Sequence, residues 1–109
     1  NMVSIIYQGR ILTTGAPSDL ERQMPFRIVE IKAKPRGTLR QVVDKTDGGF
    51  GWRAVGDRLR LSVVDPVEAQ ARIKIDLETA GAQISILREA RILMEDVFIY
   101  LVEQQEKLV

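Results

Sequence analysis

The sequence contains no cysteine and no histidine. Disulfides, thiolate nucleophiles and Cys/His zinc sites are therefore excluded, and so is the commonest general base near neutral pH. Long hydrophobic runs are also missing, because each apolar run spans only a few residues, against the roughly 20 that a membrane helix needs. Carboxylates, lysines and serines stand at no spacing typical of an active site. The sequence therefore predicts a soluble protein with no catalytic, cofactor-binding or metal-binding residues.

Net charge and aromatic content are low as well. The 16 basic and 15 acidic residues give a formal net charge of +1 and are spread along the chain, and aromatic residues make up 6%. Such a chain has no overall field that would attract nucleic acid or an acidic membrane surface, so we expect no nucleic-acid partner. What the chain does have is 45% hydrophobic residues in 109 positions. That content is enough for the core of one compact globular domain.

The first 23 residues predict a β-hairpin and a short helix. Val3–Tyr7 and Arg10–Thr13 are β-prone runs joined by Gln8-Gly9, a dipeptide suited to a tight turn. Residues 16–22 then suit a short helix, with proline in its first turn. Met24-Pro25 ends this segment and is the one candidate domain boundary in the sequence. If the chain divides at all, we therefore expect the division here, between residues 1–23 and residues 24–109.

The second segment begins with a strand of alternating pattern, FRIVEIKAK. Val29, Ile31 and Ala33 form its apolar side, whereas Ile28 falls on the side of the charged residues, so this pattern predicts a half-exposed strand. The further predicted elements, in chain order, are a helix from Thr38 to Asp44, a hairpin of residues 50–55 and 58–64 turning at Gly56-Asp57, a helix from Pro66 to Ala80 capped by Asp65 and Gly81, a strand from Gln83 to Arg88 and a helix over residues 92–107.

The predicted order from Phe26 is β-α-β-β-α-β followed by one more helix. This is the order of the ferredoxin-like split βαβ motif, whose antiparallel sheet carries both helices on one face. The expected fold class is therefore α+β. It consists of a ferredoxin-like domain with an extra C-terminal helix, preceded by the N-terminal hairpin and short helix.

Two local motifs invite a binding function and have plainer alternatives. GGFGWRAV, residues 48–55, resembles the aromatic strand of RNA-recognition domains at Phe50 and Trp52, but it departs from that pattern at Gly48, Arg53 and Val55. The alternative is that both aromatic residues pack in the core. The second motif is a run of four basic residues, which forms either a small anion site or a solvated sheet edge. Its members are Lys32, Lys34, Arg36 and Arg40.

Two helices carry more apolar surface than one buried face requires. In the helix from Pro66 to Ala80, Val67, Ala71 and Ile75 form a second stripe, nearly opposite the stripe that contains Ile73. This second stripe is either a contact with another subunit or domain, or a surface covered by the hairpin or the last helix. The last helix has a predicted core face of Leu93, Val97, Tyr100, Leu101 and Leu108. Outside that face lie Ile99 and Val102, two weaker contact candidates.

The two ends of the chain resemble parts of one protein family. SIIYQGRILTTGAPSDLERQ, residues 4–23, is similar to the segment that follows the switch-histidine loop in the ATP-binding subunits of ABC transporters. The residues that carry this similarity are Gly9, Arg10, Ile11, Gly15, Pro17 and Leu20. LMEDVFIYLVEQQ, residues 93–105, resembles the helix that closes many drug-export-type subunits of that family, with Glu95, Asp96, Val97 and Phe98 in place.

The resemblance implies that this chain is the C-terminal portion of such a subunit. Residues 1–23 would then end the nucleotide-binding core, and residues 24–109 would form a non-catalytic accessory or regulatory domain. The fragment itself would bind no cofactor, whereas the intact subunit would use ATP and magnesium to drive export. Implied partners are the core of its own subunit, a membrane-spanning permease subunit and, in a homodimer, a second copy. The implied location is cytoplasmic, at the inner face of the membrane. Two alternatives stay open, a ligand-sensing regulatory module and an RNA-recognition-like domain.

Overall fold

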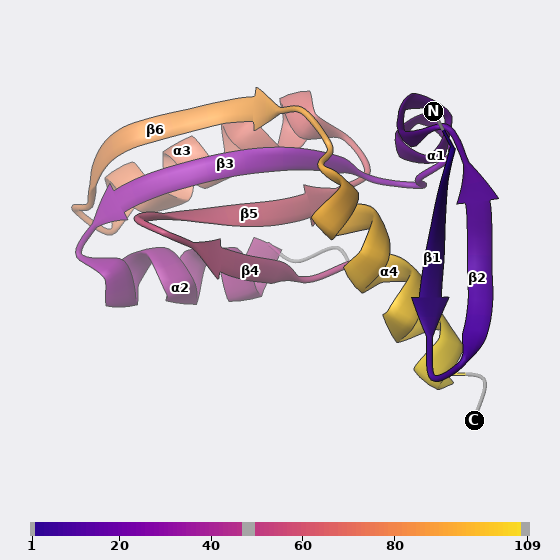
Figure 1. Ribbon diagram of the computed structural model, residues 1–109. Coiled ribbons are helices and arrows are strands. Elements are labelled where there is room, and N and C mark those ends of the chain that lie inside the picture. The colour runs from indigo at the N-terminus through magenta and orange to yellow at the C-terminus, as the bar shows by residue number, and fades with distance from the viewer. Residues whose placement is uncertain (1, 47–49, 108–109) are drawn as a thin grey trace. The chain divides into compact units, whose positions relative to one another are not determined.

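The computed structural model describes residues 2–46 and 50–107, which form six strands and four helices. The chain divides into two compact units (Figure 1). The hairpin unit comprises residues 1–24 together with residues 92–109, and the sheet unit comprises residues 25–91. The first division lies at the expected boundary, Met24-Pro25. The final helix is grouped with the N-terminal hairpin, however, whereas the expected second domain ran unbroken from residue 24 to residue 109.

The sheet unit is an antiparallel four-stranded sheet with two helices. Its strands are arranged in the order β4-β5-β3-β6, with β3 and β5 in the interior. The fold is therefore α+β, as expected. The elements of this unit are β3 (Arg27–Lys34), α2 (Arg36–Thr46), β4 (Trp52–Val55), β5 (Arg58–Val63), α3 (Pro66–Thr79) and β6 (Gln83–Ala90).

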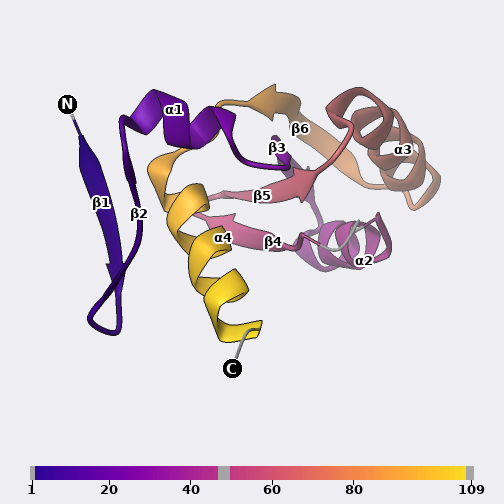
Figure 2. The same cartoon turned by 90° about the vertical axis from the view of Figure 1, so that its right-hand side faces the viewer.

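Helices α2 and α3 lie side by side against one face of this sheet (Figure 2). The core between sheet and helices is apolar throughout, and each fully buried aliphatic side chain contributes about 1.5–3 kcal/mol. Its buried members are Val29, Ile31, Ala33, Leu39, Val42, Val43, Leu59, Leu61, Val63, Ala69, Ile73 and Leu77. Leu59, Leu61 and Val63 of β5 and Leu39, Val42 and Val43 of α2 thus face the same core. The sheet and its two helices therefore enclose a continuous hydrophobic core on this face.

Local capping chemistry sets both ends of α3. The Asp65 carboxylate accepts hydrogen bonds from the backbone N–H groups of Val67 and Glu68 at 3.0 and 3.1 Å. At the other end Gly81 has φ +79°, and the N–H of Ala82 donates to the carbonyl of Leu77 at 2.9 Å. This is the left-handed glycine termination expected from the sequence. The predicted tight turn at Gly56-Asp57 is likewise present between β4 and β5.

Three local expectations are wrong. Helix α2 begins at Arg36, two residues before the predicted cap Thr38, because the carbonyl of Pro35 already accepts a hydrogen bond from the N–H of Leu39 at 3.2 Å. Ile28, expected on the half-exposed side of its strand, is only 1% exposed. Strand β3 also pairs on both sides, with β5 and β6. Lys32 therefore lies on an interior strand and not on a sheet edge.

The hairpin unit contains β1 (Val3–Tyr7), β2 (Arg10–Gly15), α1 (Pro17–Arg22) and α4 (Met94–Lys107). Gln8 and Gly9 both have positive φ, +52° and +75°, as the predicted two-residue hairpin turn requires. Strand β2 ends at Gly15, where an added Cβ atom would lie 3.1 Å from Cδ2 of buried Leu20. In the described residues none of the helices of either unit is long and apolar enough to cross a membrane.

Candidate interaction surfaces

The structure places the predicted stripe of α3 on its exposed side. Val67 is 75% exposed and Ile75 is 63% exposed, and Ala71 lies between them, also exposed. The opposite side of the helix is buried through Ala69, Ile73 and Leu77. The three predicted contact residues are therefore brought together on one helix face. Beside this face the side chains of Glu68 and Arg72 form an ion pair at 2.9 Å.

The two predicted contact residues of α4 occupy different surroundings. Ile99 lines an apolar groove between β1 and α4, so it faces the hairpin and not outward as expected. Val102 is half-buried. Of the predicted core face, Val97 is fully buried but Leu93 is 39% exposed. Leu108 lies outside the described residues. Tyr100 and Leu101 of that face are half-buried, and Asp96, which was not predicted to be buried, is 6% exposed.

A groove lies between β1 and α4 of the hairpin unit. It has a volume of about 550 Å³ and is open to one side. Its lining is mainly apolar, with Ser4 and Glu95 as the polar members, and the apolar residues are Val3, Ile5, Met94, Phe98 and Ile99. A groove of this size and polarity suits an apolar side chain or a small organic molecule. Helical spacing assigned Met94 and Phe98 to neither face of α4, so neither residue was predicted to line a groove.

The start of α4 is closed by Asp96 in the absence of a serine or threonine cap. The backbone N–H of Leu93 donates to the Asp96 carboxylate at 2.7 Å, and the carbonyl of Leu93 accepts the first helical hydrogen bonds from Asp96 and Val97. This is the backward half of a capping box, with aspartate in the place of glutamate. Asp96 is 6% exposed. One of the residues that carry the family resemblance is therefore a structural capping residue.

Tyr7 of β1 connects the hairpin to the far end of α4. Its hydroxyl donates a hydrogen bond to Glu106 Oε1 at 2.9 Å, across 99 residues of sequence. This hydrogen bond, which requires the tyrosine proton, raises the pKa of Tyr7 above its usual value of 10.0. The hydroxyl therefore stays protonated at neutral pH and serves as a donor. Strand β1 and helix α4 therefore share a hydrogen bond in addition to the apolar residues that line the groove.

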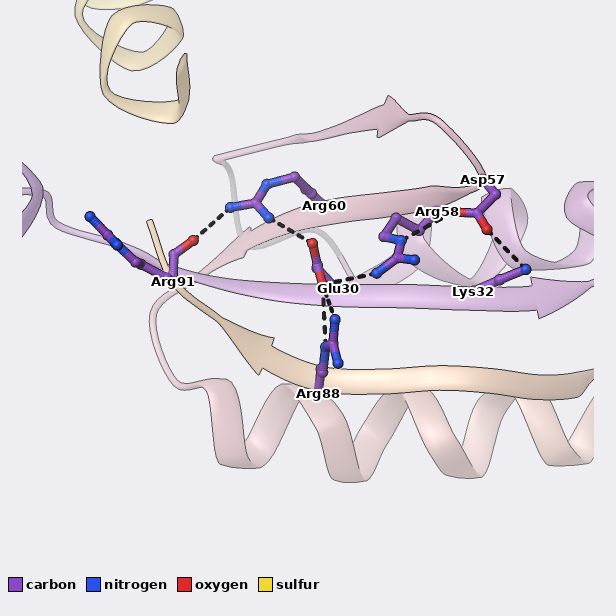
Figure 3. A network of polar contacts seen from close by, with 7 residues as sticks. All are labelled: Glu30, Lys32, Asp57, Arg58, Arg60, Arg88 and Arg91. Atoms are coloured by element: carbon purple, nitrogen blue, oxygen red, sulfur yellow. Dashed lines mark hydrogen bonds and ion pairs between the residues drawn. The ribbon is translucent and has the colours of Figure 1, made fainter. Parts of the chain in front are cut away.

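The other face of the four-stranded sheet carries a network of ion pairs centred on Glu30 (Figure 3). Glu30 pairs across the sheet with Arg60 of β5 and with Arg88 of β6. Arg60 Nη1 donates to one carboxylate oxygen of Glu30 at 2.8 Å, and Arg88 Nη2 donates to the other at 3.1 Å. Arg58 Nη1 reaches the same carboxylate at 3.5 Å. Three guanidinium groups from two strands therefore surround one carboxylate.

The centre of the network, Glu30 and Arg60, is largely buried, whereas the side chain of Arg88 is 60% exposed. Arg60 is 4% exposed and also donates to the carbonyl of Arg91 at 2.8 Å. Burial raises the pKa of Glu30, but the hydrogen bond from Arg88 and the charges of Arg60 and Arg58 outweigh it and hold that pKa below its usual value. At the adjoining hairpin turn, hydrogen bonds from Lys32 and then Arg58 lower the pKa of Asp57 to about 2. Both carboxylates are therefore ionised at neutral pH.

The predicted basic cluster is divided by the fold. Lys32 is paired with Asp57 at 2.9 Å, whereas Arg36 and Arg40 belong to α2 and line a small recess of about 30 Å³ near that turn. Lys34 is exposed at the end of β3. The four cations thus form no single anion site. In the described ranges no group of three or more acidic side chains is arranged to hold a metal ion.

The aromatic residues of the RNA-like motif both pack against other side chains of the sheet unit. Trp52 packs against the core on the helix side of the sheet, and its Nε1 donates to Asp44 Oδ1 at 2.7 Å. The ring of Phe50 packs against Phe26 with centroids 5.8 Å apart. Trp52 therefore does not lie on the open sheet face, where single-stranded RNA recognition needs its stacking rings. Gly48 and Gly49 of this motif lie outside the described residues.

Comparison with family models, curated proteins and solved structures gives no significant match. The interpretation of these surfaces therefore rests on the residues and on their geometry.

Proposed function

We propose that this chain is a non-catalytic C-terminal accessory domain of the ATP-binding subunit of an ABC transporter. The intact subunit would bind and hydrolyse ATP with magnesium and drive export through a membrane-spanning permease, at the cytoplasmic face of the membrane. The chain itself would perform no chemistry. Its role would be to regulate the subunit or to stabilise contacts between subunits.

One observation carries this proposal: the two segments that resemble the family assemble into one unit. Residues 4–23 and residues 93–105 are far apart in sequence, yet both belong to the hairpin unit. Tyr7 and Glu106 are hydrogen-bonded at 2.9 Å, and Ile5 and Val97 are buried in this unit. Two resemblances to one family that assemble in space support a common origin more strongly than two separate motifs do.

The family-like residues also hold positions where their chemistry is needed. Gly9 takes the positive φ of the hairpin turn, and Pro17 occupies the first turn of α1. Leu20 is buried against Gly15, and Asp96 caps α4. The sheet unit adds its β-α-β-β-α-β element order and antiparallel strands, which support the ferredoxin-like assignment.

The decisive experiment compares this chain with the full polypeptide encoded by its gene. We expect the upstream reading frame to encode a phosphate-binding loop and a switch histidine, and the full polypeptide to hydrolyse ATP. The 109-residue chain alone should neither bind nor hydrolyse ATP in calorimetric and phosphate-release assays. An upstream frame without a phosphate-binding loop, or ATP hydrolysis by the isolated chain, would contradict the proposal.

A second candidate, a ligand-sensing module, is favoured by the groove between β1 and α4. Its volume of about 550 Å³ and apolar lining match those of small-molecule sites. If the groove senses a ligand, an apolar drug or amino acid should raise the thermal stability of the chain. Phe98→Ala should abolish that rise, while Ile75→Ala on α3 should leave it unchanged. A ligand effect that survives Phe98→Ala would exclude the groove as the site.

A further inference from the structure

The exposed apolar surface of the sheet unit is concentrated on one helix. In the described part of this unit the exposed large hydrophobic residues are Val64, Val67 and Ile75, which lie on α3 or immediately before it. Val67 and Ile75, with Ala71 between them, form a stripe on the side of α3 opposite its buried side. Such a concentration on an otherwise charged helix is the mark of a contact surface.

The spacing of the stripe specifies the shape of its partner. Val67, Ala71 and Ile75 are four residues apart and so form one ridge along the helix surface. Two helices that pack by such ridges cross at about 50°, and a small residue at the crossing point lets them approach closely. Ala71 is the small residue here, with one large aliphatic residue four positions away on each side. The ridge is therefore symmetric in position about Ala71, as a twofold contact between identical helices requires.

The charged residues beside the ridge of one copy are complementary to the same residues of a second copy. When two copies of α3 pack antiparallel about a twofold axis at Ala71, each flank of the helix meets the same flank of the other copy. Glu68 and Arg72 share one flank, where they are paired at 2.9 Å. Glu68 of one copy then lies opposite Arg72 of the other, and the reverse holds as well. On the second flank Lys74 meets the uncharged Gln70.

We propose that α3 forms an antiparallel contact between two copies of this chain, centred on Ala71 and anchored by Val67 and Ile75. A surface one helix wide is smaller than a permanent interface, so the dimer is a weak one that forms with rising concentration. The proposal goes beyond the proposed function and does not depend on it, because it concerns only the self-association of this polypeptide.

The absence of cysteine makes a direct test possible, because an introduced cysteine is the only thiol in the chain. Two Ala71→Cys side chains would face each other at the crossing, within the short Cα separation that a disulfide needs. We expect mild oxidation to give a disulfide-linked dimer. Thr79→Cys is the matched control, since its two copies would lie roughly 24 Å apart along the helices. A dimer from Thr79→Cys or from Ile11→Cys on the hairpin, but none from Ala71→Cys, would overturn the proposal.

Sedimentation equilibrium up to about 0.5 mM protein tests the energetics of the contact. Ile75→Glu should weaken self-association roughly tenfold, because it places an unpaired charge in the contact. Glu68→Arg should weaken it about threefold by opposing like charges, and adding Arg72→Glu should restore it. Circular dichroism checks that each variant is folded. A wild-type chain that stays monomeric, or a dimer that Ile75→Glu leaves unchanged, would refute the α3 contact, while the proposed function would stand on its own ATPase test.

Discussion

The sheet unit and the hairpin unit differ in how completely each buries its apolar residues. The sheet unit has four strands, two helices and a continuous cluster of twelve buried hydrophobic residues. The hairpin unit has a two-stranded sheet, and among its described residues the buried hydrophobic ones are Ile5, Leu20, Ile92 and Val97. Among its described residues, five large apolar side chains are exposed, namely those of Met2, Ile6, Ile11, Leu93 and Phe98.

This difference indicates which unit can fold stably without the other. An isolated two-stranded hairpin is marginally stable in water, whereas three or more strands with a covered face are stable alone. We therefore expect the sheet unit to fold cooperatively and the hairpin unit to be the weaker of the two. Trp52, the one tryptophan of the chain, lies in the sheet unit and reports on it selectively.

The largest expected effect comes from the core of the sheet unit. Ile73→Ala removes a fully buried side chain and should lower the free energy of unfolding by about 3 kcal/mol. Denaturant titration followed by Trp52 fluorescence measures this loss. Val97→Ala in the hairpin unit is the matched change, and it should leave the Trp52 transition almost unmoved. Equal shifts for both variants would show that the two units unfold as one, which would break the comparison.

Glu30→Gln should cost about 2 kcal/mol at neutral pH, because it leaves buried Arg60 and its neighbours without their carboxylate. The same variant should alter the pH dependence. The pKa of Glu30 is lowered in the folded state, so its contribution is present above about pH 4.5 and is lost as the pH falls through the folded value. Unfolding curves from pH 7 to pH 3 should show a smaller acid loss for the variant. An identical loss in both proteins would exclude Glu30 as a source of the dependence.

Two glycines test the units separately at a smaller scale. Gly81 and Gly9 both have φ near +75° and open space around an added Cβ atom, so alanine at either position is strained only in its backbone. Gly81→Ala should destabilise the Trp52 transition by about 1 kcal/mol. Gly9→Ala should change only the circular dichroism and hydrogen exchange of the hairpin. A Trp52 shift caused by Gly9→Ala would indicate coupling between the units.

The smallest effect on stability is expected at the outer face of the hairpin. Ile11 is 66% exposed and lies opposite exposed Ile6, so Ile11→Thr should change unfolding by less than about 0.5 kcal/mol. It should nevertheless reduce aggregation at high concentration, because it breaks an apolar patch on a strand pair with unprotected edges. Light scattering before and after the substitution measures this. Unchanged scattering would assign aggregation to another surface.

Much of the fold could be predicted because its signals are local. Asp65-Pro66 starts α3 and Gly81 ends it through hydrogen bonds within a few residues of each terminus. The Gly56-Asp57 turn is local in the same sense, because it joins residues that are adjacent in sequence. The outer stripe of α3 followed from helical spacing alone. None of these features needs information about a distant part of the chain.

The Glu30 network could not be predicted because it depends on strand register. Glu30 is separated from Arg60 by 30 residues and from Arg88 by 58, and a slip of one residue would turn its side chain to the other face. Ile28 was misassigned for the same reason, since its burial is decided by what covers the second face of the sheet. The direction of Ile99 depended on the packing of α4, which helical spacing does not fix.

The chain enters and exits the sheet unit at neighbouring positions. Ile28, near its start, pairs directly with Ala90, near its end, on neighbouring antiparallel strands. A segment whose entry and exit points are adjacent can be cut out, shortened or exchanged for a relative, because a short linker bridges the gap that remains. Residues 25–91 are thus a cassette that evolution or an engineer can replace while the flanking segments keep their own covalent continuity.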